Sequence, residues 1–222
     1  HDREQLVLGA LLGHWSAPGL SGATPIANDL VQLLAKTQTT VVTSLAAPWG
    51  NLVLFRQVSE RRNDPLLAAL TSAAERSHSP DWARSLTPEL RQQAYDRTVG
   101  GFQLAHHGDV RIAVGSGTPD ADCFYGHCLH TELWHLAHAG LTPLQILRQA
   151  TLGNAEALGT AEHFGSLAPG KFADLVLLDK DPLVDIHNTL SIAYVVSEGR
   201  TFQRGAPLHI APPPSAVPKD KL

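Results

Sequence analysis

Residues 110–126 read VRIAVGSGTPDADCFYG, and this stretch decides the fold class. Val110, Ile112 and Val114 make its first part typical of a short buried strand. Residues 116–126 are rich in Ser, Gly, Pro and Asp, and they predict a loop. Ligands of α/β proteins bind beyond the carboxyl ends of the strands, so this loop is the first candidate for a functional site.

Helices and strands alternate on both sides of that loop, which indicates an α/β protein. Leu30, Leu33 and Leu34 share one helical face, and the β-branched run at residues 39–45 predicts a buried strand. The helices expected from apolar spacing and start signals cover residues 29–36, 49–62, 64–77, 87–107 and 130–139, and a further helix starts at Thr142 with Gln145 placed for a capping box.

The C-terminal part of the chain changes character. Its expected strands are residues 173–179, 192–197 and 201–203. The last residues are Pro-rich and predict a disordered tail. We therefore expect three parts, a helix/strand region at 1–164, a small β region at 165–206 and a tail at 207–222.

The composition excludes several classes of partner. The 222 residues include 17 Lys and Arg against 21 Asp and Glu, and the formal charge of −4 offers no footprint for nucleic acid or an anionic membrane. No apolar run approaches the roughly 20 residues of a membrane span, so we expect a soluble chain. Cys123 and Cys128 are too few for a disulfide framework, and they leave the compartment open between cytoplasm and periplasm.

Several polar side chains could carry chemistry. Asp120 offers a carboxylate that suits a metal ligand or a general base, although Asp is equally a turn residue, and spacing alone favours the turn. His14 is either an imidazole ligand or a surface residue of a Gly/Ser loop. His135 and His138 support a metal or, as we favour, form a solvated helix face.

The text from residue 110 to 204 resembles the amidohydrolase superfamily, in VRIAVGSGTPDADCFYGHCLHTELWHLAHAGLTPLQILRQATLGNAEALG and in GSLAPGKFADLVLLDKDPLVDIHNT followed by YVVSEGR. The likeness is to imidazolonepropionase-like and dipeptidase-like amidohydrolases, and residues 24–45 resemble the preceding helix and strand more loosely. The resemblance implies an α/β fold, the C-terminal part of a (β/α)8 metal-dependent hydrolase barrel plus strands of a small β-sandwich.

The same resemblance implies a metal-dependent hydrolase that acts on carbon–nitrogen bonds of non-peptide amides, cyclic amides or dipeptides. It implies one or two divalent metal ions as cofactor, with zinc expected and with most ligands upstream of His1. Within this chain it makes His14 the expected metal ligand and Asp120 the expected catalytic residue. The substrate-binding residues that we expect are Ser116, Thr118, Tyr125 and His130.

One departure from the family pattern keeps a second function open. The family's metal-binding aspartate is written GTD or GSD, whereas residues 115–117 read GSG and place Gly117 at the carboxylate position. The alternative is therefore a degenerate, non-catalytic structural or binding domain. A complete barrel takes about 250 residues, so we expect a C-terminal fragment that is inactive in isolation. Its expected partners are a small-molecule substrate and the missing N-terminal half of the barrel, or a second chain that replaces it.

Overall fold

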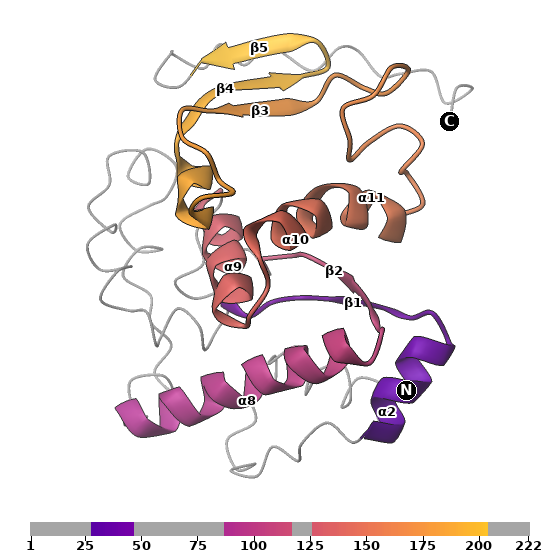
Figure 1. Cartoon of the computed structure of the whole chain (residues 1–222), viewed down its shortest axis with the longest axis vertical. Helices are drawn as coiled ribbons and strands as arrows, with labels where there is room; N and C mark the ends of the chain where they lie inside the picture. Colours follow the sequence, from indigo (N-terminus) through magenta and orange to yellow (C-terminus); the bar gives the residue numbers. More distant parts are fainter. Residues whose placement is uncertain (1–27, 47–86, 117–125, 204–222) are drawn as a thin grey trace, which may run out of the picture.

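Two short parallel strands lie at the centre of the structure, a computed structural model that describes residues 28–46, 87–116 and 126–203. Strand β1 (Thr40–Val42) pairs in register with β2 (Arg111–Ala113). Helix α8 lies on one side of this pair, and helices α10 and α11 lie on the other (Figure 1). The predicted α/β arrangement is confirmed, and both strands are shorter than the apolar runs that predict them.

The described helices before β2 begin and end within one residue of the predicted bounds. They are α2 (Asn28–Lys36) and α8 (Pro88–His107). Thr87 caps α8, because its side-chain oxygen accepts a hydrogen bond from the Leu90 amide at 3.3 Å. Val31 and Leu34 of α2 pack with Ala105 of α8 in a small cluster beside the strands.

Four helical segments of the described chain lie between β2 and β3. They are α9 (His127–His138), α10 (Pro143–Arg148), the π-helical turn η2 (Gln149–Gly153) and α11 (Asn154–Ala157). The predicted capping box of α10 is present, since Thr142 and Gln145 each bond the other's backbone amide. Helix α9 begins at His127 rather than at residue 130, and its first turn buries Cys128 against Ala46.

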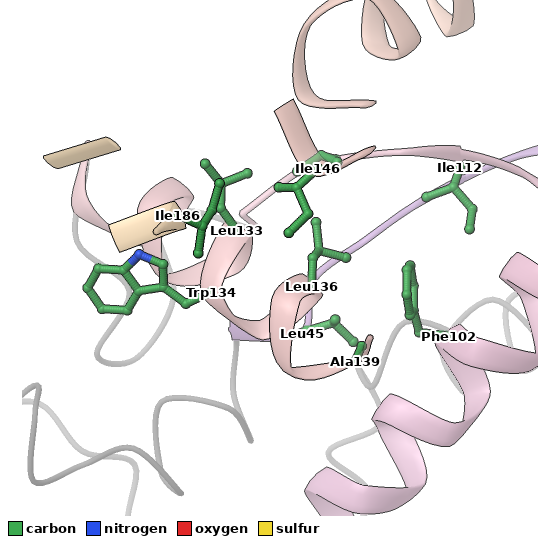
Figure 2. Packing of buried hydrophobic residues seen from close by; sticks show 10 residues of the cluster. Leu45, Phe102, Ile112, Leu133, Trp134, Leu136, Ala139, Ile146 and Ile186 are labelled. Carbon is green, nitrogen blue, oxygen red and sulfur yellow. The ribbon is translucent and has the colours of Figure 1, made fainter. Parts of the chain in front are cut away.

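The main core lies where these helices meet the strands. Figure 2 shows Leu136 of α9 and Ile146 of α10 pointing toward one another, with Ile112 of β2 and Phe102 of α8 beside them. Leu136 and Ile146 are completely buried. Removing such side chains from water supplies most of the stability of the fold, so this cluster fixes the positions of β1, β2 and α9.

The C-terminal part forms a separate antiparallel sheet in the order β3-β4-β5. Its elements are β3 (Leu175–Leu178), the 3-10 helix η3 (Ile186–Leu190), β4 (Ile192–Ser197) and β5 (Arg200–Gln203). Glu198 and Gly199 both have positive φ, as the tight turn of a twisted hairpin requires. The three predicted strands are confirmed, with shifted ends.

The 3-10 helix η3 joins this sheet to α9. Ile186 enters the main core, and the His187 ring stacks on Trp134 with centroids 4.5 Å apart. His130 of α9 and Thr189 of η3 share a hydrogen bond of 2.9 Å. These contacts attach the small sheet to the helix that packs behind the strands.

Both sheets are open in the described part of the chain. The parallel sheet there has two strands and does not close into a barrel. Val176 and Phe202 on one face of the antiparallel sheet, and Leu177 and Tyr194 on the other, are all exposed. No helix within the described ranges has the length and apolar character needed to cross a bilayer. The helices predicted at 49–62 and 64–77 lie outside the described residues.

Candidate active site

The candidate site is the edge where the two parallel strands end. We name it the strand-end rim, and it consists of residues 43–46 after β1 and residues 114–116 after β2. The Thr43 amide donates to the Ala113 carbonyl at 2.8 Å, and the Gly115 amide donates to the Thr43 hydroxyl at 3.4 Å. These bonds hold the two strand ends together, so side chains from both strands face one region.

Glu132 of α9 holds the β1 side of the rim. Its two carboxylate oxygens accept hydrogen bonds from the Leu45 amide at 3.0 Å and the Ala46 amide at 2.7 Å. The side chain is 0% exposed. Burial raises the pKa of Glu132 to about 7, while hydrogen bonds from Ala46, Leu45 and Thr43 act to lower it.

Asn154, the first residue of α11, holds the β2 side of the rim. Its amide oxygen accepts from the Val114 amide at 2.7 Å, and its amide nitrogen donates to the Val114 carbonyl at 2.9 Å. The Gln149 side chain donates to the Ile112 carbonyl. Five residues separate Gln149 from Asn154, and the wider π-helical turn between them lets both side chains reach the same strand.

A second buried polar contact lies behind the rim, between α8 and α9. The Tyr95 hydroxyl lies 2.7 Å from Nδ1 of His135. His135 is 1% exposed, and burial lowers its pKa to about 4, with a smaller contribution from the charge of His138. Burial, together with the charges of Glu132 and Asp96, raises the pKa of Tyr95. Within the described residues, Nε2 of His135 has no hydrogen-bond partner.

The solvated-face interpretation of the His135 and His138 pair is therefore wrong for His135. Only His138 is exposed. His135 lies on the side of α9 that faces α8, where Tyr95 provides a partner for one ring nitrogen. An i, i+3 pair of histidines on a short helix straddles the boundary of its buried face, and spacing alone does not reveal this.

Two of the predicted site residues belong to the described part of the chain. Ser116 is a partly exposed member of the rim. His130 is partly buried on α9, where Nδ1 bonds Thr189 of η3 rather than a rim residue. The other predicted residues, His14, Thr118, Asp120 and Tyr125, lie outside the described residues, as does Gly117.

The donor atoms at the rim decide whether it can hold a metal ion. Among the described residues, no group of three or more His, Cys, Asp or Glu side chains is arranged to hold a metal ion. Thr43, Ser44 and Ser116 offer hydroxyl groups, and the Glu132 carboxylate is already bonded to two amides. Divalent zinc prefers imidazole, thiolate and free carboxylate ligands, so these residues alone do not fit it.

Sequence reasoning missed Glu132 and Asn154. A signal for Glu132 existed, because Cys128 and Leu136 lie four residues before and after it on one helical line, and both are buried. An acid on such a line must find partners inside the protein. No comparable pattern marks Asn154, since its role depends on a π-helical turn that the sequence does not announce.

Comparison with known proteins identifies the family that this architecture resembles. Residues 98–202, from within α8 to β5, match the model of the amidohydrolase family. The chain resembles the C-terminal part of an amidohydrolase. The resemblance stated from the sequence is thereby confirmed, and so is the fold class that it implies.

Curated proteins similar to this chain include two that differ in coverage. An imidazolonepropionase of Geobacillus kaustophilus is 37% identical over 168 residues, which cover 71% of this chain and 36% of that protein. An adenine deaminase of Jannaschia sp. is 38% identical over 69 residues, covering 31% of this chain and 11% of that protein. The chain thus spans about a third, or less, of the length of these relatives.

Solved structures agree on the fold. A structure titled as a putative prolidase from Bifidobacterium longum superposes with a TM-score of 0.54 at 26% identity, covering 74% of this chain and 35% of that one. A structure titled as an amidohydrolase superposes with a TM-score of 0.55 at 22% identity, covering 80% of this chain and 38% of that one. The second likeness shows the fold alone.

Proposed function

We propose that this amidohydrolase segment contributes the strand-end rim of a hydrolase that cleaves carbon–nitrogen bonds in small molecules. The observation that carries the proposal is the family match over residues 98–202, which includes β2, its rim residues and the helices that hold them. The names of its relatives, an imidazolonepropionase, an adenine deaminase and a putative prolidase, support this class of bond. The substrates that we propose are non-peptide amides, cyclic amides or dipeptides.

The catalytic roles in this proposal fall on the loop after β2. Asp120 is the proposed catalytic carboxylate, acting as a general base toward the attacking water. Ser116, Thr118, Tyr125 and His130 are the proposed substrate-binding residues. Support for this assignment comes from Ser116, which follows the two peptide groups that Asn154 and Thr43 bond, so the loop leaves a fixed point of the sheet.

A divalent metal belongs to the proposal because amidohydrolases are generally metal-dependent. Zinc is the expected ion and His14 its proposed ligand in this chain. The described residues supply no such set of ligands, so further ligands would come from a complementary barrel segment, in the same polypeptide or in a second chain. Support for such a segment comes from the open two-stranded sheet of the described residues.

One specific observation favours a second function, a degenerate domain without catalysis. Gly117 stands where the family has an aspartate, and glycine offers neither a ligand nor a base. In that case the rim would survive as a scaffold while hydrolysis is lost. The two functions differ in what a restored carboxylate does.

The test compares wild type with Gly117→Asp in protein that carries the complementary barrel segment, with zinc present, on a panel of Xaa-Pro dipeptides, N-acyl amino acids and cyclic amides. We expect the variant to bind more zinc, measured by elemental analysis after dialysis, and to hydrolyse at least one class about tenfold faster or more. Gly117→Asn, which adds a side chain of nearly the same size without the charge, is the matched control. If neither wild type nor Gly117→Asp binds zinc or hydrolyses any class when the complementary segment is present, the catalytic proposal is wrong and the degenerate domain remains.

A further inference from the structure

The most unusual buried group of the described residues is the carboxylate of Glu132. It lies in the middle of α9, is 0% exposed, and reaches across to the chain just beyond β1. No cation contributes to its ionisation among the described residues; the balance is set by burial and by hydrogen bonds. Its place in the fold therefore needs a reason other than ion pairing.

Burying a carboxylate without a cation is costly, since the ion loses its hydration. An apolar side chain of similar size would fill the same volume between Cys128 and Leu136 without that cost. Glu132 therefore stabilises the fold less than an apolar side chain of the same size would. What the acid adds is a pair of acceptor oxygens aimed at the rim.

Two backbone amides at the rim require those acceptors. Leu45 and Ala46 follow the end of β1, and both residues are buried, so their N–H groups cannot be left to water. An ionised carboxylate accepts both amides with separate oxygens, as observed. A glutamine in the same place has a single acceptor oxygen and would satisfy only one of them well.

We propose that Glu132 is a positioning residue whose negative charge fixes the Leu45 and Ala46 peptide groups, and thereby sets the path of the chain that leaves β1 at the rim. The proposal rests on the proposed function, because it concerns the same site. Glu132 acts through the backbone and is not itself a catalytic residue. The rim geometry on the β1 side therefore depends on the charge of one buried side chain.

The groups around Glu132 are known from each element packed against it. His135 lies on its own helix, Tyr95 lies on α8, and Thr43 lies at the end of β1. The charge of His138 acts on His135, and that of Asp96 acts on Tyr95. His135 stays neutral near pH 7 because burial lowers its pKa to about 4. Tyr95 stays neutral there as well, since its pKa is raised. Of these three ionisable groups, Glu132 is the one whose pKa burial brings to about 7.

The test is an NMR titration of the backbone amides of the full chain, in wild type, Glu132→Gln and the control Glu156→Gln. Glu156 is an exposed acid with a surface contact to Arg148 at 3.5 Å, so its change leaves the rim intact. In wild type and in the control, we expect the Leu45 and Ala46 amide protons to move downfield together with a shared midpoint near pH 7, because a charged acceptor polarises N–H more strongly.

In Glu132→Gln that shared titration should disappear. Amide exchange at Leu45 and Ala46 should rise about tenfold, while exchange at Leu141, whose amide bonds the Leu136 carbonyl, stays at the wild-type rate. The proposal is overturned if the two amides of the wild-type chain do not titrate together. It is also overturned if exchange at Leu141 rises as much as at the rim, since that pattern means general destabilisation.

If Glu132→Gln fails to fold, the titration of the wild-type chain still tests the positioning role of Glu132. None of these signals needs hydrolysis, so failure of the proposed function and failure of this inference are separate results. Where hydrolysis is found, we expect Glu132→Gln to lower kcat about tenfold and to leave KM within about twofold. An increase in KM with kcat unchanged would contradict a positioning role.

Discussion

At the scale of single residues, two buried groups of α9 act on stability in opposite directions. Burial raises the pKa of Glu132 from 4.5 to about 7, so its contribution to stability is fully present below pH 4.5 and is lost as the pH rises through 7. Burial lowers the pKa of His135 from 6.5 to about 4, so its contribution is present above pH 6.5 and is lost as the pH falls through 4.

The first prediction concerns Glu132→Gln, a variant that has no carboxyl group at this position. Relative to wild type, Glu132→Gln should gain roughly 3 kcal/mol in the free energy of unfolding between about pH 4.5 and 7, because the variant lacks a proton that the wild-type fold holds across that window. Urea unfolding at both pH values measures the difference. Glu156→Gln should keep the wild-type profile, and a Glu132→Gln profile parallel to wild type would refute the buried-acid account.

The second residue-scale prediction concerns Asn154. In Asn154→Ala the buried Val114 peptide group loses both of its side-chain partners, and we expect a loss of about 1–3 kcal/mol in the free energy of unfolding. Asn188 is the matched control, because its side chain donates one exposed bond to the Asp181 carbonyl. A loss in Asn188→Ala as large as that in Asn154→Ala would show that the two hydrogen bonds between Asn154 and Val114 contribute no more to stability than an exposed side-chain bond.

The residues that hold the rim were the hardest to predict. Asp120 and Ser116 are candidate site residues because they follow a strand, and the order of residues along the chain is enough to predict this. Glu132 and Asn154 act on strands that precede them by 86 and 40 residues, measured to Ala46 and Val114. Such pairings depend on the tertiary fold, and no local pattern in the sequence encodes them.

At the scale of elements, local chemistry predicts the bounds of the helices better than those of the strands. Thr87 and Thr142 cap their helices as the sequence indicates, because capping uses residues only three apart. The apolar runs at 39–45 and 110–115 exceed strands β1 and β2 at both ends. Most of the extra residues at the carboxyl ends, Thr43, Ser44, Leu45 and Val114, are buried at the rim rather than paired in a ladder, and apolar character alone does not separate these two states.

The element-scale prediction concerns the capping box of α10. Thr142→Ala removes the acceptor of the Gln145 amide, and we expect a loss of about 1 kcal/mol in the free energy of unfolding. Thermal unfolding followed by circular dichroism measures it. Thr151→Ala is the control, because that hydroxyl bonds the Leu147 carbonyl within a helical turn and caps nothing. A stability of Thr142→Ala equal to that of Thr151→Ala would contradict the capping role.

At the scale of the whole molecule, the fold class came from the resemblance rather than from periodicity. Alternating helices and strands indicate an α/β protein, and this pattern is shared by many folds. The run from Val110 to Gly159 and the motif around Lys171 narrow the choice of α/β fold to that of the amidohydrolases, a resemblance that the family match confirms. Lys171 itself bonds the Ala161 carbonyl and the Ser166 hydroxyl, a role in loop structure rather than chemistry.

Our central proposal is that this chain forms part of a working metal-dependent amidohydrolase. The most direct test is the intact mass and metal content of the protein isolated without denaturant from its source cells. We predict a mass well above 23.8 kDa, with a bound divalent metal in the same particle. A particle of 23.8 kDa without metal and without a partner would contradict the claim and leave a degenerate amidohydrolase-like domain.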